Sequence, residues 1–125
     1  KDYLTATQAR FVEICQAIVQ AMKLEVRDIS EVPNGCQILA VEAEQKWRGA
    51  RKMPKLIRFF RVPEMIDDSS IRNLHEAMKK MQITKGLIIT SSNFSRRAIE
   101  FAETRPIDLY NKDQLLVILA QSNLQ

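Results

Sequence analysis

The stretch "KGLIITSSNFSRRAIEFAE", residues 85–103, joins an apolar run, a polar break and a mixed polar and apolar segment. Within it, "GLIIT" (86–90) is apolar on both faces, which is typical of a central strand covered by helices. Ser95 has the residue type of a helix N-cap, and the residues that follow it are suited to a helix. The stretch therefore predicts a buried strand that leads into a capped helix.

The residues after this stretch predict a second strand and a last helix. Pro106 is expected to end the preceding helix, and "IDLY" (107–110) has the length of a short strand. Asn111 and Gln114 are spaced as a capping box. A further helix is therefore expected to run to about Ala120.

The residues before the stretch predict another helix. Asp67 and Asp68, followed by Ser69, supply a cap and negative charge at a helix start. Apolar residues then recur at helical spacing over residues 71–81. Strands and helices thus alternate through the second half of the chain, which is the pattern of β-α-β crossovers.

The first half predicts one helix followed by three strands. Thr5 and Gln8 are spaced as a capping box, and the apolar pattern behind them predicts a helix over about residues 6–23. The strands are expected at residues 24–32, 36–43 and 55–62, with a turn at 33–35. The complete order, αβββαβαβα, predicts an α/β fold with a single mixed sheet, an antiparallel meander plus crossovers, flanked by helices.

The third predicted strand, "KLIRFFRV" (55–62), contains two cations. Arg58 and Phe60 are expected to share one face of the sheet and Arg61 the other, because strand side chains alternate. A cation is costly to bury unless it is paired or reaches a polar ligand. These arginines therefore either face solvent or line a site.

The positive charge of the chain is concentrated in residues 46–61, which we call the basic segment. It contains seven basic residues and no acidic ones: Lys46, Arg48, Arg51, Lys52, Lys55, Arg58 and Arg61. The rest of the chain holds 12 of the 19 basic residues against 15 acidic ones, so the net charge of +4 depends on this segment. Such a local field favours a polyanion, and nucleic acid before membrane, because no amphipathic helix accompanies it. A solvated loop without a partner is the alternative.

Length and composition fit one soluble domain over residues 1–125, with 46% hydrophobic and 27% charged residues. No apolar run approaches the roughly 18 residues that span a bilayer, so no membrane partner is expected. Cys15 and Cys36 lack metal-ligand spacing and favour a reducing, cytoplasmic setting. Without an initiator Met or a signal segment, the chain is expected to belong to a larger protein with other domains. Homodimer formation stays open.

The second half of the chain resembles the Mrr-like branch of the restriction endonuclease superfamily. The resemblance rests on "IRNLHEAM" (71–78), "KGLIITSSNFSRRAIEFAE" (85–103) and "PIDLYNKDQLLVIL" (106–119). The resemblance extends over roughly residues 55–120. For the first 54 residues it rests only on the order of the predicted helices and strands. It implies a restriction endonuclease-like fold and DNA as the partner.

The resemblance also implies the place of a metal site. Relatives hold a divalent metal with an Asp on the second core strand and a Glu or Gln two residues before a Lys on the third. Counting back twelve residues from Arg72, as the family spacing implies, places the Lys position on Phe60 and the Glu or Gln position on Arg58. The Asp position falls on about Gln37, because the expected hairpin pairs residue 37 with residue 60.

These three residues cannot perform the work of the metal site. Gln37 offers a neutral oxygen, Arg58 repels a cation, and Phe60 carries no charge. We therefore predict a catalytically inactive accessory domain that binds DNA or another nucleic acid and needs no cofactor. A protein-interaction or scaffold domain of the same fold is one alternative.

An active Mg²⁺-dependent DNA endonuclease is the other alternative, and it uses a second set of residues. Glu44 and Lys46 have the Glu-x-Lys spacing, and Glu42 lies two residues earlier. In this alternative, Asp28 on the first predicted strand takes the place of the metal-binding Asp that relatives carry on the second core strand.

Two further features complete the predicted interface with nucleic acid. Trp47 lies among cations and can stack on a base, or else fold back on the sheet. Ser92 precedes a helix start whose first turn holds Arg96 and Arg97, where free N–H groups can bind a phosphate. The predicted contacts are Lys46, Trp47, Arg48, Arg51, Lys52, Lys55, Arg58, Arg61, Ser92, Arg96 and Arg97.

Overall fold

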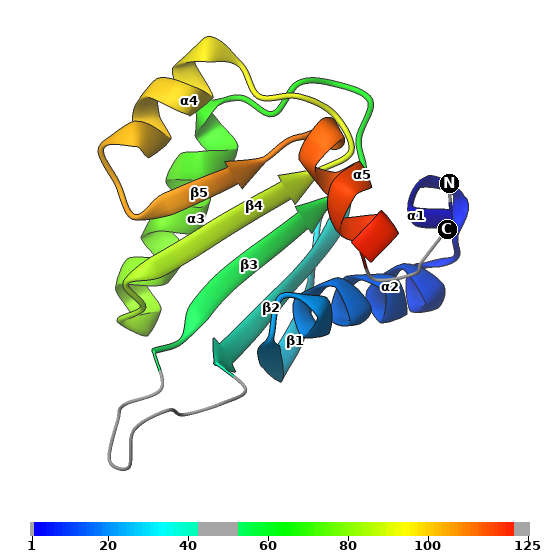
Figure 1. The fold of residues 1–125 in the computed structure, drawn as a ribbon. Helices are drawn as coiled ribbons and strands as arrows, with labels where there is room; N and C mark the ends of the chain where they lie inside the picture. Colours follow the sequence, from blue (N-terminus) through cyan, green and yellow to red (C-terminus); the bar gives the residue numbers. More distant parts are fainter. Residues whose placement is uncertain (1, 43–52, 122–125) are drawn as a thin grey trace.

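The computed structural model describes residues 2–42 and 53–121 (Figure 1). Its elements follow the predicted order, with one additional short helix at the N-terminus. They are α1 (Asp2–Thr5), α2 (Gln8–Ala21), β1 (Leu24–Val32), β2 (Gly35–Glu42), β3 (Lys55–Phe60), α3 (Asp68–Met81), β4 (Lys85–Thr90), α4 (Arg96–Glu103), β5 (Ile107–Tyr110) and α5 (Lys112–Gln121). None of the helices in these two ranges is both long and apolar enough to cross a membrane.

The strands form one five-stranded mixed sheet in the order β1-β2-β3-β4-β5. β2 pairs antiparallel with both β1 and β3, whereas β4 pairs parallel with both β3 and β5. The helices α3 and α4 connect the parallel strands. This arrangement confirms the predicted fold class, a mixed sheet made of an antiparallel meander and two β-α-β crossovers.

Two hydrophobic cores lie on the two faces of the sheet. α2 and α5 cover one face, and α3 and α4 cover the other (Figure 1). Ile57 and Phe59 of β3 point into the α2 core, and Leu56 points into the α3 core. β4 supplies Leu87 to the first core and Ile88 to the second, as its apolar sequence predicts.

Hydrogen bonds confirm two of the predicted helix caps. The N–H of Ala98 donates to Ser95 Oγ at 3.1 Å, which places Ser95 at the N-cap of α4. The N–H of Asn111 donates to Gln114 Oε1 at 2.8 Å, and Asn111 Oδ1 accepts from the N–H of Gln114 at 3.2 Å. These caps fix the residues at which α4 and α5 begin.

The predicted capping box that begins at Thr5 is wrong. The cap of α2 is Thr7, whose Oγ1 accepts a hydrogen bond from the N–H of Arg10 at 3.3 Å. Thr7 is extended, with φ −61° and ψ 164°, so it separates α1 from α2. At this break the carbonyl of Ala6 accepts a hydrogen bond from Arg61 Nη1 at 2.6 Å. A distant side chain therefore stabilises a break that the local pattern does not reveal.

The register between β2 and β3 differs from the predicted one by two residues. Gln37 pairs with Arg58, and Phe60 pairs with Gly35. A Cβ built on Gly35 would lie 1.7 Å from the carbonyl oxygen of Phe59. Only glycine permits so close an approach, so Gly35 fixes its own pairing with Phe60. Counting residues from the expected tip of the hairpin does not give this register.

Replacing Gly35 with alanine is expected to lower the free energy of unfolding by about 3 kcal/mol, because the strand backbone must shift. Urea unfolding followed by circular dichroism measures this loss. Gly86→Ala is the matched control, since its Cβ would meet the Met78 sulfur, at 2.5 Å, rather than backbone. Met78 can adjust, so a smaller loss is expected there. Equal losses in the two variants would contradict this account of the register.

Candidate functional site

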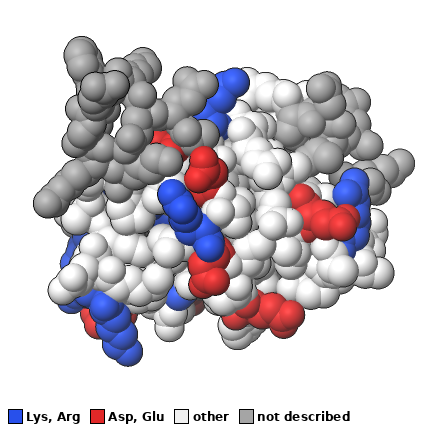
Figure 2. All heavy atoms as spheres, turned by 90° about the horizontal axis from the view of Figure 1, so that it is seen from below, with Lys and Arg blue, Asp and Glu red and all other residues white. Residues whose placement is uncertain are grey.

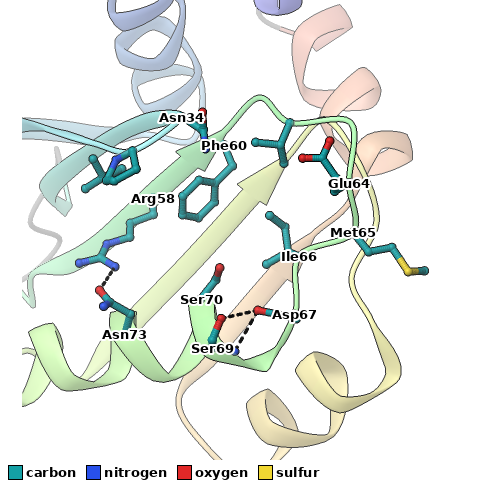
Figure 3. A pocket seen from close by; sticks show the side chains of 13 residues that line it. Asn34, Arg58, Phe60, Glu64, Met65, Ile66, Asp67, Ser69, Ser70 and Asn73 are labelled. Carbon is teal, nitrogen blue, oxygen red and sulfur yellow. Dashed lines mark hydrogen bonds between the residues drawn. The ribbon is translucent and has the colours of Figure 1, made fainter.

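A row of polar side chains crosses the α3 side of the sheet. Arg58 Nε donates to Gln37 Oε1 at 2.7 Å. Its Nη1 donates to Asn73 Oδ1, also at 2.7 Å (Figure 3). Gln37 Nε2 in turn donates to Ser30 Oγ at 3.4 Å. The row links β1, β2, β3 and α3, so the guanidinium is held in a fixed position.

Arg58 carries a positive charge that no nearby acid balances. It is only 8% exposed, and both of its hydrogen-bond partners are neutral. In the part of the chain that the structure describes, no carboxylate oxygen lies within 4.0 Å of its nitrogens. Burial lowers the pKa of Arg58, but a guanidinium stays protonated in proteins. Hydrogen bonds to the two amide oxygens offset the cost of burying this charge.

The three positions that the resemblance implies for a metal site lie together. Gln37 contacts Arg58 directly, and Phe60 lies two residues further along β3, on the same face of the sheet. The guanidinium is bound to the side-chain oxygens of both Gln37 and Asn73. Among residues 2–42 and 53–121, no group of three or more His, Cys, Asp or Glu side chains is placed to hold a metal ion.

A pocket of about 460 Å³ lies beside Arg58, and we call it the Phe60 pocket. It is formed by the β1–β2 turn, the end of β3 and the start of α3, and the Phe60 ring projects into it (Figure 3). Its lining residues are Val32, Pro33, Asn34, Arg58, Phe60, Val62, Glu64, Met65, Ile66, Asp67, Ser69, Ser70 and Asn73.

Two carboxylates contribute to the lining of the Phe60 pocket. Asp67 is the N-cap of α3, and its Oδ1 accepts hydrogen bonds from the N–H of Ser69, at 3.1 Å, and from the Ser69 hydroxyl. Glu64 lies in the loop before α3 and is exposed. Neither acid is identified as a site residue from the sequence, and nor is Asn73. The only signal for Asn73 is its position beside the apolar stripe of α3.

Arg61 lies on the other side of the sheet from Arg58, as strand alternation predicts. Its Nη1 donates to the Ala6 carbonyl at 2.6 Å, and its Nη2 donates to Gln8 Oε1 at 3.3 Å. The guanidinium also lies 4.3 Å from the centroid of the Phe11 ring. Arg61 therefore ties the N-terminal segment to the end of β3, while its contact with nucleic acid stays a prediction.

Arg61→Ala is expected to lower the free energy of unfolding by about 2 kcal/mol, because it removes charged hydrogen bonds and a cation–π contact. Thermal and urea unfolding measure the change. Arg96→Ala, at an exposed position of α4, is the control and is expected to change stability by less than about 0.5 kcal/mol. A loss of similar size in both variants would show that Arg61 does not hold the N-terminal segment.

The other predicted contacts within the described residues lie outside the pocket. Lys55 is half-buried at the start of β3, and Arg96 and Arg97 are exposed in the first turn of α4. Ser92 is buried, and its hydroxyl lies 2.9 Å from the Thr90 hydroxyl. The Ser92 side chain is therefore buried against Thr90 and is not presented to a phosphate from solution.

The acids of the endonuclease alternative lie on opposite faces of the sheet. Asp28 pairs with Leu39, which packs against the α3 core. Glu42 lies two residues after Ala40 on β2 and therefore on the same face, the one that the α2 core covers. Asp28 and Glu42 therefore do not form one site. The other predicted residues of this region lie outside the described residues: Glu44, Lys46, Trp47, Arg48, Arg51 and Lys52.

The net charge of the chain also comes from outside the described residues. Five of the 19 basic residues and one of the 15 acidic residues fall there, which leaves 14 of each in residues 2–42 and 53–121. Figure 2 shows Lys, Arg, Asp and Glu side chains interspersed on one face of the molecule. The described surface on this face therefore has no extended electrostatic field of a single sign. The predicted positive field is assigned to the basic segment.

Comparisons with known proteins agree with this fold. The family model Mrr_cat, described as restriction endonuclease, matches residues 4–119. The structure of the DNA modification-dependent restriction endonuclease AspBHI is similar, with a TM-score of 0.66 and 11% identity, over 97% of this chain and 35% of that one. A protein of unknown function, AF1548, gives a TM-score of 0.68 and 16% identity, over 94% of this chain and 67% of that one. A search of curated proteins finds no match.

Proposed function

Since this chain belongs to the restriction endonuclease family, we propose that it binds DNA through the phosphate backbone without cleaving it. The name of AspBHI describes an enzyme that acts on DNA, which supports DNA as the partner. The chain spans 35% of the length of AspBHI. We therefore propose that it works as one accessory domain of a larger protein.

The absence of cleavage is inferred from one observation, the place of Arg58. A hard divalent cation needs oxygen ligands, and the resemblance implies that they lie around this position. Here Gln37 Oε1 and Asn73 Oδ1 both accept hydrogen bonds from Arg58 at 2.7 Å. A Mg²⁺ ion at these two oxygens would meet the fixed positive charge of the guanidinium at short range. Arg58 thus takes the place of the metal in the proposed inactive site.

DNA binding is assigned mainly to the basic segment. Lysine and arginine bind phosphates irrespective of the base sequence, and they release counterions as they do so. Trp47 can add stacking on a base or packing against a sugar. The proposed phosphate contacts are Lys46, Arg48, Arg51, Lys52 and Lys55, with Arg96 and Arg97 as a second group.

Fluorescence anisotropy with labelled duplex DNA in Mg²⁺ and in Mn²⁺ tests this function. We expect binding that weakens steeply as salt rises, because phosphate contacts dominate it. A denaturing gel of the same samples is expected to show intact strands.

Two results would replace the proposal with one of its alternatives. Metal-dependent cleavage that disappears in Lys46→Ala would favour an active endonuclease that uses Glu44 and Lys46. A chain that binds no DNA even at low salt would favour a protein-interaction domain. Cleavage that persists in Lys46→Ala would point instead to a contaminating nuclease, so this variant is also the control.

A further inference from the structure

We propose that the Phe60 pocket receives one unstacked nucleobase of a bound DNA strand. This inference rests on the DNA binding proposed above and names the part of the DNA that the pocket takes. A base needs an aromatic or apolar surface for its ring and hydrogen-bonding groups for its edge. The pocket has an aromatic and apolar surface on its β3 side and hydrogen-bonding groups at the start of α3.

Phe60 supplies the stacking surface. Its ring projects into the pocket and is half-buried rather than enclosed in the core (Figure 3). Val62 and Ile66 extend the same apolar lining. The volume of about 460 Å³ lies within the range of small-molecule sites, roughly 300–1,000 Å³, so a base with its sugar can enter.

The charges of the pocket favour a neutral ring over a phosphate. The lining holds two acids, Glu64 and Asp67, and one cation, Arg58, and neither acid forms an ion pair with Arg58 in the described part of the chain. A phosphate placed inside would therefore be repelled more than attracted. A carboxylate accepts hydrogen bonds from exocyclic amino groups, which cytosine, adenine and guanine carry and thymine lacks. The pocket is thus expected to prefer an amino-bearing base.

At the start of α3, two residues of the pocket have polar groups that a ligand can bind. The Ser70 hydroxyl makes no hydrogen bond within residues 2–42 and 53–121. The Asn73 amide uses its oxygen for Arg58, at 2.7 Å, which leaves its two N–H donors available. A base edge presents acceptors and donors that can satisfy both groups, whereas an apolar ligand cannot.

Single-stranded oligonucleotides of equal length separate the contribution of the base from that of the phosphates. Oligo-dC, oligo-dT and an abasic oligonucleotide carry the same number of phosphates. We expect wild-type protein to bind oligo-dC about fivefold or more tightly than the abasic strand, as base–aromatic stacking implies. Oligo-dT is expected to bind more weakly than oligo-dC.

Phe60→Leu is expected to bring the affinity for oligo-dC within about twofold of that for the abasic strand, whose own affinity stays unchanged. Phe101→Leu is the matched control, because Phe101 is also half-buried but packs between Arg72 and Arg105, outside the pocket. It is expected to keep the wild-type ratio. If Phe60→Leu does not fold, the NMR signals of the wild-type Phe60 ring replace it, and they are expected to shift with oligo-dC but not with the abasic strand.

The results distinguish this inference from the function on which it rests. Equal affinity of the wild-type protein for oligo-dC and the abasic strand would overturn the base pocket and leave DNA binding in place. An unchanged ratio in folded Phe60→Leu would overturn it as well. Failure to bind any of the strands would overturn the proposed function itself.

Discussion

Simultaneous replacement of Arg48, Arg51 and Lys52 by glutamine is expected to weaken duplex DNA binding about a hundredfold at low salt. Each lost phosphate contact lowers the slope of log affinity against log salt by about one, so a decrease of about three is expected. The prediction rests on charge, because the segment supplies the net positive charge of the chain. Anisotropy titrations at several salt concentrations measure both quantities.

A second triple variant serves as the matched control for net charge. Arg10, Arg27 and Lys112 are exposed on α2, β1 and α5, apart from the basic segment in the sequence. Their replacement by glutamine removes the same total charge, and it is expected to reduce affinity by only a few fold. Equal losses in the two triple variants would show that binding depends on overall charge and not on the segment.

The combined variant Gln37→Asp, Arg58→Glu and Phe60→Lys is expected to bind Mn²⁺ and to cleave DNA with Mg²⁺ or Mn²⁺. Residues 37 and 58 pair across β2 and β3, so the introduced carboxylates lie side by side on the α3 face. The amine at position 60 follows on the same face. Replacement of Arg58 also frees Asn73 Oδ1, which in the wild-type protein accepts a hydrogen bond from Arg58 at 2.7 Å.

Gln37→Asp alone is the control for this redesign. The introduced carboxylate then meets the Arg58 guanidinium, and the two are expected to form an ion pair that leaves no charge for a metal. Manganese titration and plasmid cleavage measure both variants. If the combined variant folds and binds no manganese, this end of the sheet does not correspond to the metal site of the family.

The fold could be predicted because its strongest signals are local. The apolar run of β4 requires cover on both faces, and the caps at Ser95 and Asn111 set the two helix starts that follow β4 and β5. The order of the elements then leaves few topologies. The break at Thr7 could not be predicted, because it depends on Arg61, more than fifty residues away.

The site was only partly predictable, for a related reason. Arg58 is conspicuous in the sequence because a cation in an apolar strand requires an explanation. Gln37 was assigned to the site through an expected pairing with residue 60, whereas the observed register pairs it with Arg58. Asn73 and Glu64 come from α3 and its preceding loop, and no spacing in the sequence relates them to β3.

We propose that the Arg58 guanidinium stands at the position where the family holds a metal ion. Manganese titration of the wild-type protein, followed by electron paramagnetic resonance in the presence of DNA, tests it most directly. We expect no saturable manganese site on the protein, because Arg58 repels the ion and holds the oxygens of Gln37 and Asn73. A saturable site with one ion per chain, accompanied by DNA cleavage that Lys46→Ala abolishes, would contradict the account.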